Sequence, residues 1–78
     1  MVTVRCFASV REMLGITTLE YPLAAPTTAE EILVAVAGER LDILPARPLV
    51  AINMQYSHLQ SLVHDGDELA FFPPVSGG

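Results

Sequence analysis

The sequence ends in two glycines, and this ending has the most evident chemical potential in the chain. Gly77 and Gly78 follow Val75 and Ser76. Four extended residues span at most about 14 Å, and glycines can pass through a channel too narrow for other side chains. The terminal carboxylate could therefore react in another protein's active site. The alternative is a frayed end without function.

A carboxylate is a poor electrophile, so its use would require activation, for example as an acyl-adenylate formed from ATP. The chain has no phosphate-binding glycine loop of the Walker type. We therefore expect a partner protein to carry out the activation.

Other residue types used in catalysis lack productive spacing. The single cysteine, Cys6, lies on the apolar face of a predicted strand, where a buried thiol is usually inert. His58 and His64 have no metal-ligand spacing with a cysteine or with each other. Asp65-Gly66-Asp67 is too short for a calcium loop and predicts a turn. We expect no metal site and no cofactor.

Composition restricts the class of protein. The 78-residue chain has four Arg, no Lys and nine acidic residues, which give a net charge of −5. Nucleic-acid affinity depends largely on clustered Lys and Arg, so this balance argues against nucleic acid and favours a basic protein surface as the partner. A domain of this size has little volume for a deep catalytic pocket.

We expect neither a membrane span nor a secretory signal. The longest stretch without charge, residues 48–63, is interrupted by polar side chains. Met1 leads directly into an alternating pattern, without the basic region and apolar run of a signal peptide. A single cysteine cannot form an internal disulfide. These features predict a cytoplasmic protein with no membrane partner.

Strands are predicted near both ends of the chain. Alternation with period two over residues 2–8 places one set of side chains on the apolar face, namely Val2, Val4, Cys6 and Ala8. Ser9 is a candidate N-cap for a short helical turn ending at Gly15, and residues 17–23 predict a second strand that pairs with the first. Further strands are predicted at residues 49–53 and 68–72, and a short strand is predicted within residues 57–63.

The strongest helix signal lies between these groups of strands. Thr28 and Glu31 have capping-box spacing, and Gly38 can end the helix. Residues 39–44 are less decided. The order of elements predicts an α+β domain, with a mixed sheet of four to five strands and one main helix across one face. A β-grasp (ubiquitin-like) fold is our first choice, and a ferredoxin-like fold, which needs a second full helix, is the alternative.

The last strand leads into the carboxyl-terminal segment. Pro73 and Pro74 should end the strand because proline lacks a donor N–H, which predicts a domain over residues 1–74 and a flexible tail over 75–78. Phe71 should face the core. Phe7 and Phe72 should lie on the opposite face, where we favour a hydrophobic patch for a partner over packing on the helix side.

The whole chain resembles the small subunit of molybdopterin synthase, the MoaD family of β-grasp sulfur carriers. The resemblance rests on Phe7-Ala8, on Arg11-Glu12 with Leu14-Gly15, and on Val-Ala-Ile-Asn at residues 50–53. Above all it rests on residues 65–78, which end in Phe-Phe-Pro-Pro-Val-Ser-Gly-Gly. Residues 16–48 carry little of it.

The resemblance implies a carrier that is itself not catalytic. An E1-like adenylating enzyme would activate Gly78, and a sulfur donor protein would convert it to a thiocarboxylate. Gly77 would help the tail to thread into the large subunit of a heterotetrameric molybdopterin synthase. There the thiocarboxylate would give sulfur to cyclic pyranopterin monophosphate to form molybdopterin. Partner-binding positions would be Phe7, Phe72, Pro73, Pro74, Val75 and Ser76.

Three other functions stay open on the sequence. A sulfur carrier for thiamine or cysteine synthesis would use the same tail chemistry. A ubiquitin-like modifier would join its tail to a lysine of a target, although a chain without Lys could not build Lys-linked chains on itself. A purely structural β-grasp module would leave the two glycines unexplained.

Overall fold

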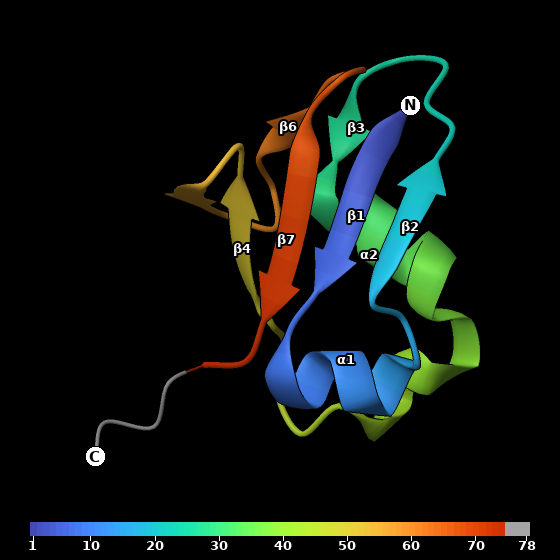
Figure 1. Cartoon of the computed structure of the whole chain (residues 1–78), viewed down its shortest axis with the longest axis vertical. Coiled ribbons are helices and arrows are strands. Elements are labelled where there is room, and N and C mark those ends of the chain that lie inside the picture. Colours follow the sequence, from blue (N-terminus) through green and yellow to red (C-terminus); the bar gives the residue numbers. More distant parts are fainter. Residues whose placement is uncertain (75–78) are drawn as a thin grey trace.

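A five-stranded mixed sheet with the order β2-β1-β7-β4-β5 forms the centre of the structure (Figure 1). The structure is a computed structural model that describes residues 1–74. The strands of this sheet are β1 (Val2–Cys6), β2 (Thr18–Tyr21), β4 (Leu49–Ile52), β5 (Gln55–Ser57) and β7 (Glu68–Phe72). A two-stranded sheet pairs β3 (Thr27–Thr28) with β6 (Leu62–Val63). The helices are α1 (Ala8–Leu14), α2 (Ala29–Ala37) and the 3₁₀ helix η1 (Gly38–Ile43).

The last strand, β7, occupies the middle of the sheet. It runs parallel to β1, with Cys6 opposite Phe71, and antiparallel to β4, with Val50 opposite Phe71. The predicted antiparallel pairing of the first two strands is also present, between β1 and β2. This insertion of the final strand between β1 and β4 confirms the predicted mixed sheet and the β-grasp fold.

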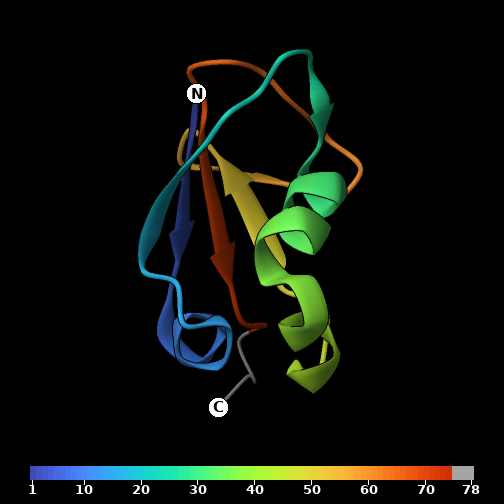
Figure 2. The same cartoon turned by 90° about the vertical axis from the view of Figure 1, so that its right-hand side faces the viewer.

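Alternation along the strands determines which face of the sheet is buried. Val2, Val4 and Cys6 of β1 point into the core, as predicted, and Phe71 of β7 has no exposed surface. The helix α2 covers this face (Figure 2). It contributes Ala29, Ile32, Leu33 and Ala37 to the core. Full burial of one such aliphatic or aromatic side chain contributes about 1.5–3 kcal/mol, so the core depends on this register.

The start of α2 follows the predicted cap in part. Thr28 is the N-cap, and its Oγ1 accepts a hydrogen bond from the backbone N–H of Glu31 at 3.2 Å. The carboxylate of Glu31 does not complete the capping box, because it accepts a hydrogen bond from the hydroxyl of Thr27. Gly38 follows the last residue of α2, as predicted, and η1 then continues through the segment that the sequence left undecided.

One local prediction, the N-cap at Ser9, is wrong. The N-cap of α1 is Phe7, not Ser9, and Ala8 leaves the strand pattern with φ +50° as the helix begins. Residues 57–63 do hold a short strand, as predicted, which is β6, while Ser57 ends β5 of the other sheet.

The strand β7 ends at Phe72, directly before Pro73, as predicted. The predicted tail, residues 75–78, lies outside the described residues, so the division into domain and tail stays a prediction. No helix within residues 1–74 combines the length and the apolar character that crossing a membrane requires.

Candidate functional site

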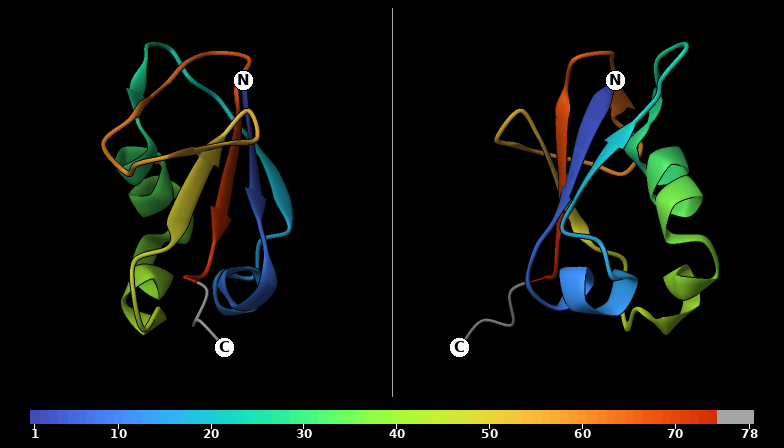
Figure 3. Two further views of the ribbon diagram at one scale, coloured as in Figure 1. Left: turned by 90° about the vertical axis from the view of Figure 1, so that its left-hand side faces the viewer. Right: turned by 45° about the vertical axis from the view of Figure 1, so that its right-hand side comes forward.

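The face of the main sheet that points away from α2 carries an open groove. The helix α2 packs on the other face of this sheet (Figure 3). The groove has a volume of about 340 Å³. We call it the open-face groove, and its lining residues are Arg5, Phe7, Ala51, Met54, Tyr56, Glu68, Ala70 and Phe72.

Small and aromatic side chains give the open-face groove its shape. Ala51 and Ala70 face each other across the β4–β7 pair and leave room above the sheet. Tyr56 and Phe72 meet edge to face, with their ring centroids 5.8 Å apart. The guanidinium of Arg5 lies 5.4 Å from the ring centroid of Phe7. The groove is thus largely apolar and aromatic, and its two charged side chains, Arg5 and Glu68, lie 3.7 Å apart.

Phe7 and Phe72, which the sequence places on the face away from the core, come together in this groove. The backbone N–H of Phe7 donates to the carbonyl of Phe71 at 3.0 Å, which anchors the start of α1 beside the end of β7. Phe7 is 40% exposed, whereas Phe71 is fully buried. The predicted orientation of these aromatics is confirmed. Their contact with a partner stays a prediction.

The remaining predicted site residues follow the groove along the chain. Pro73 is half-buried and Pro74 is exposed, directly after β7. Val75, Ser76, Gly77 and Gly78 lie outside the described residues, and their predicted roles stay predictions. A segment leaving β7 begins at the edge of the open-face groove, because Phe72 lines it.

Sequence reasoning missed Met54 and Tyr56, which are the most exposed large apolar side chains of the groove. Met54 is 90% exposed and Tyr56 is 86% exposed. Both belong to the β4–β5 hairpin, whose two-residue loop is Asn53-Met54. The one signal for this turn was Asn53, because asparagine suits the first position of a type I′ turn.

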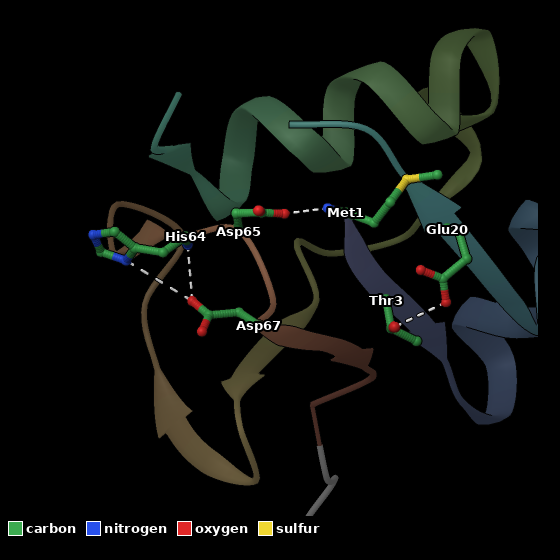
Figure 4. Close-up of polar contacts among 6 residues, drawn as sticks. All are labelled: Met1, Thr3, Glu20, His64, Asp65 and Asp67. Carbon is green, nitrogen blue, oxygen red and sulfur yellow. Dashed lines mark hydrogen bonds and ion pairs between the residues drawn. The ribbon is translucent and has the colours of Figure 1, made fainter. Parts of the chain in front are cut away.

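A polar network fixes this hairpin at the end of the sheet where β7 begins. The side chain of Asn53 donates to Asp67 Oδ1 at 3.0 Å and accepts from the backbone N–H of Glu68 at 2.9 Å. Asp67 also accepts from the backbone N–H of His64 at 2.8 Å, and Asp65 pairs with the amino group of Met1 (Figure 4). The hydrogen bond from His64, followed by that from Asn53, holds the pKa of Asp67 below its usual value.

The other candidate chemical groups, Cys6, His58 and His64, do not line the open-face groove. Cys6 is 2% exposed, as predicted, and burial raises the pKa of its thiol, so at neutral pH it is a protonated, inaccessible group. His64 lies 3.8 Å from Asp67 through its Nδ1. No group of three or more His, Cys, Asp or Glu side chains within this part of the chain is arranged to hold a metal ion.

The fold and the groove together define a β-grasp domain that presents an apolar surface beside the exit of its carboxyl-terminal strand. The profile of the ThiS family matches residues 4–78, and the chain belongs to that family.

Three related proteins show where the chain stands within this class. It is 42% identical, over the whole of both chains, to the molybdopterin synthase sulfur carrier subunit of Haemophilus influenzae. It is 37% identical, again over both whole chains, to the molybdopterin synthase sulfur carrier subunit of Escherichia coli. The crystal structure of small archaeal modifier protein 1 from Haloferax volcanii superposes with a TM-score of 0.76 at 27% identity, covering 95% of this chain and 97% of that one.

Proposed function

We propose that this protein is the sulfur carrier subunit of a molybdopterin synthase. The full-length similarity to two carrier subunits of that enzyme, at 42% and 37% identity, is the observation that carries the proposal. The Phe-Phe-Pro-Pro-Val-Ser-Gly-Gly ending, which starts in the central strand of the sheet, supports it.

The reacting group of the proposed carrier is the carboxylate of Gly78. An E1-like adenylating enzyme transfers AMP from ATP to this carboxylate and releases pyrophosphate. A sulfur donor protein then supplies sulfur at the oxidation level of sulfide, which attacks the acyl-adenylate, displaces AMP and leaves a thiocarboxylate. In the large subunit, the thiocarboxylate gives this sulfur to cyclic pyranopterin monophosphate. Two such transfers build the dithiolene of molybdopterin.

The described residues are consistent with a carrier that performs no catalysis itself. The single thiol is buried and protonated, so it does not compete with the tail as a sulfur nucleophile. A net charge of −5 also disfavours binding of a phosphorylated pterin to this chain, which supports a substrate pocket on the large subunit.

We propose the open-face groove as the surface that binds the large subunit. Phe7 and Phe72 supply aromatic area, and Phe72 is separated from the predicted tail by Pro73 and Pro74 alone. A subunit that accepts the tail must therefore lie close to this groove. Aromatic side chains in such positions are frequent anchors of protein interfaces.

Intact mass spectrometry of the protein purified from its own cells tests the proposal. Replacement of one terminal oxygen by sulfur is the expected result. The protein should then convert cyclic pyranopterin monophosphate when it is mixed with the purified large subunit, and a variant lacking Gly78 should not. A thiocarboxylate without any product formation would point to a carrier for another pathway, such as thiamine or cysteine synthesis.

A ubiquitin-like modifier is the second candidate, because one structural relative is named small archaeal modifier protein 1. In that case the activated Gly78 would be joined to a lysine of a target protein. Covalent conjugates of the tagged protein in cells, absent from the variant lacking Gly78, would favour the modifier. Their absence together with molybdopterin formation would favour the carrier.

A further inference from the structure

The loop of the β4–β5 hairpin combines two unfavourable features at one residue. Asn53 and Met54 have φ values of +52° and +68°, and Ile52 pairs directly with Gln55, which is the pattern of a type I′ turn. Glycine is preferred at the second position of such a turn, because a Cβ is strained in the left-handed region. This chain has methionine there, with 90% of its surface exposed.

The surrounding structure holds Met54 in this conformation. The backbone N–H of Asn53 donates to the carbonyl of Glu68 at 2.8 Å, and the backbone N–H of Glu68 donates to Asn53 Oδ1 at 2.9 Å. The Asn53 side chain also bonds to Asp67. Three hydrogen bonds thus fix the residue before Met54 to the start of β7. Strained residues persist where neighbouring structure enforces them, and such positions are concentrated at binding sites.

Met54 and Phe72 stand at opposite ends of the open-face groove. Glu68 begins β7 on the side of Met54, and Phe72 ends it at the exit of the chain. The four residue intervals from Glu68 to Phe72 correspond to about 14 Å along β7. A subunit that accepts the tail lies against the Phe72 end, and an interface of ordinary size extends along the groove to Met54.

Charge indicates the chemistry of the surface that meets Met54. Glu68 lines the groove beside it, and Asp67, in the turn before β7, is bonded to the neighbouring Asn53. Asp65 of that turn is paired with the amino group of Met1. The cation of the groove, Arg5, is already within 3.7 Å of Glu68. The Met54 end is therefore apolar at its tip, with the carboxylates of Glu68 and Asp67 beside it. An apolar pocket bordered by Lys or Arg is complementary to such a surface.

We infer that Met54 is a partner-binding residue that inserts into an apolar pocket with a basic rim, on the subunit that accepts the carboxyl-terminal tail. This inference rests on the proposed function. A flexible thioether side chain is well suited to fill such a pocket. Methionine therefore occupies a turn position that prefers glycine, and this lowers the free energy of unfolding of the unbound protein.

Three substitutions separate binding from stability. Met54→Leu keeps an apolar side chain, Met54→Gln keeps a similar length but is polar, and Met54→Gly removes both the side chain and the strain. Leu62→Gln is the matched control, because Leu62 is also an exposed apolar residue but lies on β6, away from the groove. The measurements are thermal unfolding and calorimetric affinity for the purified molybdopterin synthase large subunit of the same organism.

Met54→Leu and Leu62→Gln should bind within about twofold of the wild type, while Met54→Gln and Met54→Gly should bind about tenfold more weakly. Met54→Gly should at the same time raise the Tm by about 4 °C. If Met54→Gln and Met54→Gly bind like the wild type, or Met54→Gly lowers the Tm, the inference is wrong while the proposed function stands. If the wild type itself does not bind the large subunit, the proposed function fails, and the inference with it.

Discussion

Phe71 and Phe72 are neighbours in the chain but should respond in opposite ways to truncation. Phe71 is fully buried between the sheet and α2, whereas Phe72 lines the open-face groove. Phe71→Ala should therefore impair folding. Phe72→Ala should leave a cooperatively folded domain that binds the large subunit poorly.

The sizes of the two effects follow from these surroundings. Truncation of a buried Phe to Ala costs about 3–5 kcal/mol. A domain of this length has a total stability of about 4–12 kcal/mol, so Phe71→Ala removes a large part of it and lowers the Tm by about 12 °C or more. Phe72 loses its edge contact with Tyr56, worth about 0.5–1.5 kcal/mol. Its loss from an interface should weaken binding about 30-fold, as for a residue worth about 2 kcal/mol.

Urea unfolding and calorimetric titration with the large subunit measure both quantities for each variant. Phe7→Ala is a useful companion, because Phe7 lies in the same groove and should behave like Phe72. Tight binding by a folded Phe72→Ala protein would refute the groove as the docking surface. Greater destabilisation by Phe72→Ala than by Phe71→Ala would refute the assignment of the two faces.

Three further predictions concern the thiol, the tail and pH. Cys6→Ser should remain folded, although burial of an unpaired hydroxyl should lower its free energy of unfolding by about 1–3 kcal/mol. The variant should still be thiocarboxylated at Gly78. A folded variant without thiocarboxylate in its mass spectrum would assign the sulfur to Cys6. Adding one residue after Gly78 moves the carboxylate by about 3.5 Å. Product formation should be abolished by this extension, by deletion of Gly78 and by Gly77→Val, while thermal unfolding of all three variants stays unchanged. Full activity of the extended protein would exclude a tail that reacts at its end. Because the folded pKa of Asp67 is lowered, its stabilising contribution should be complete above its unfolded pKa of about 4 and be lost as pH falls through the folded value. Thermal unfolding between about pH 6 and pH 2 should therefore show the advantage of the wild type over Asp67→Asn shrinking on acidification, and a constant difference would contradict this.

Strong local patterns made the core of the fold predictable from the sequence. Alternation placed Val2, Val4 and Cys6 on the buried face, and the capping pair Thr28 and Glu31 located the start of α2. Each of these signals lies within a few adjacent residues. Such signals determine which side chains face the core once the order of elements is known.

The Met54 end of the groove could not be predicted, because its signals are non-local or contrary to local preference. Asn53-Met54 lacks the glycine that marks a type I′ turn, and the conformation depends on hydrogen bonds to Asp67 and Glu68, fourteen and fifteen residues away.

Other parts of the fold also lack a local signal. The strands β3 and β6 have two residues each, too few to show a period. The contact of Arg40 with the carbonyl of Leu14 at 3.3 Å likewise joins distant segments.

The central position of β7 also determines how the domain bears mechanical load. Hydrogen-bonded ladders join this strand to β1 on one edge and to β4 on the other. A pulling force that enters at Phe72 acts along the strand and across both ladders, so their hydrogen bonds share the force and must break together rather than one after another. A partner that draws on the end of the chain therefore meets a body in which β7 resists extraction by shear against both neighbouring strands.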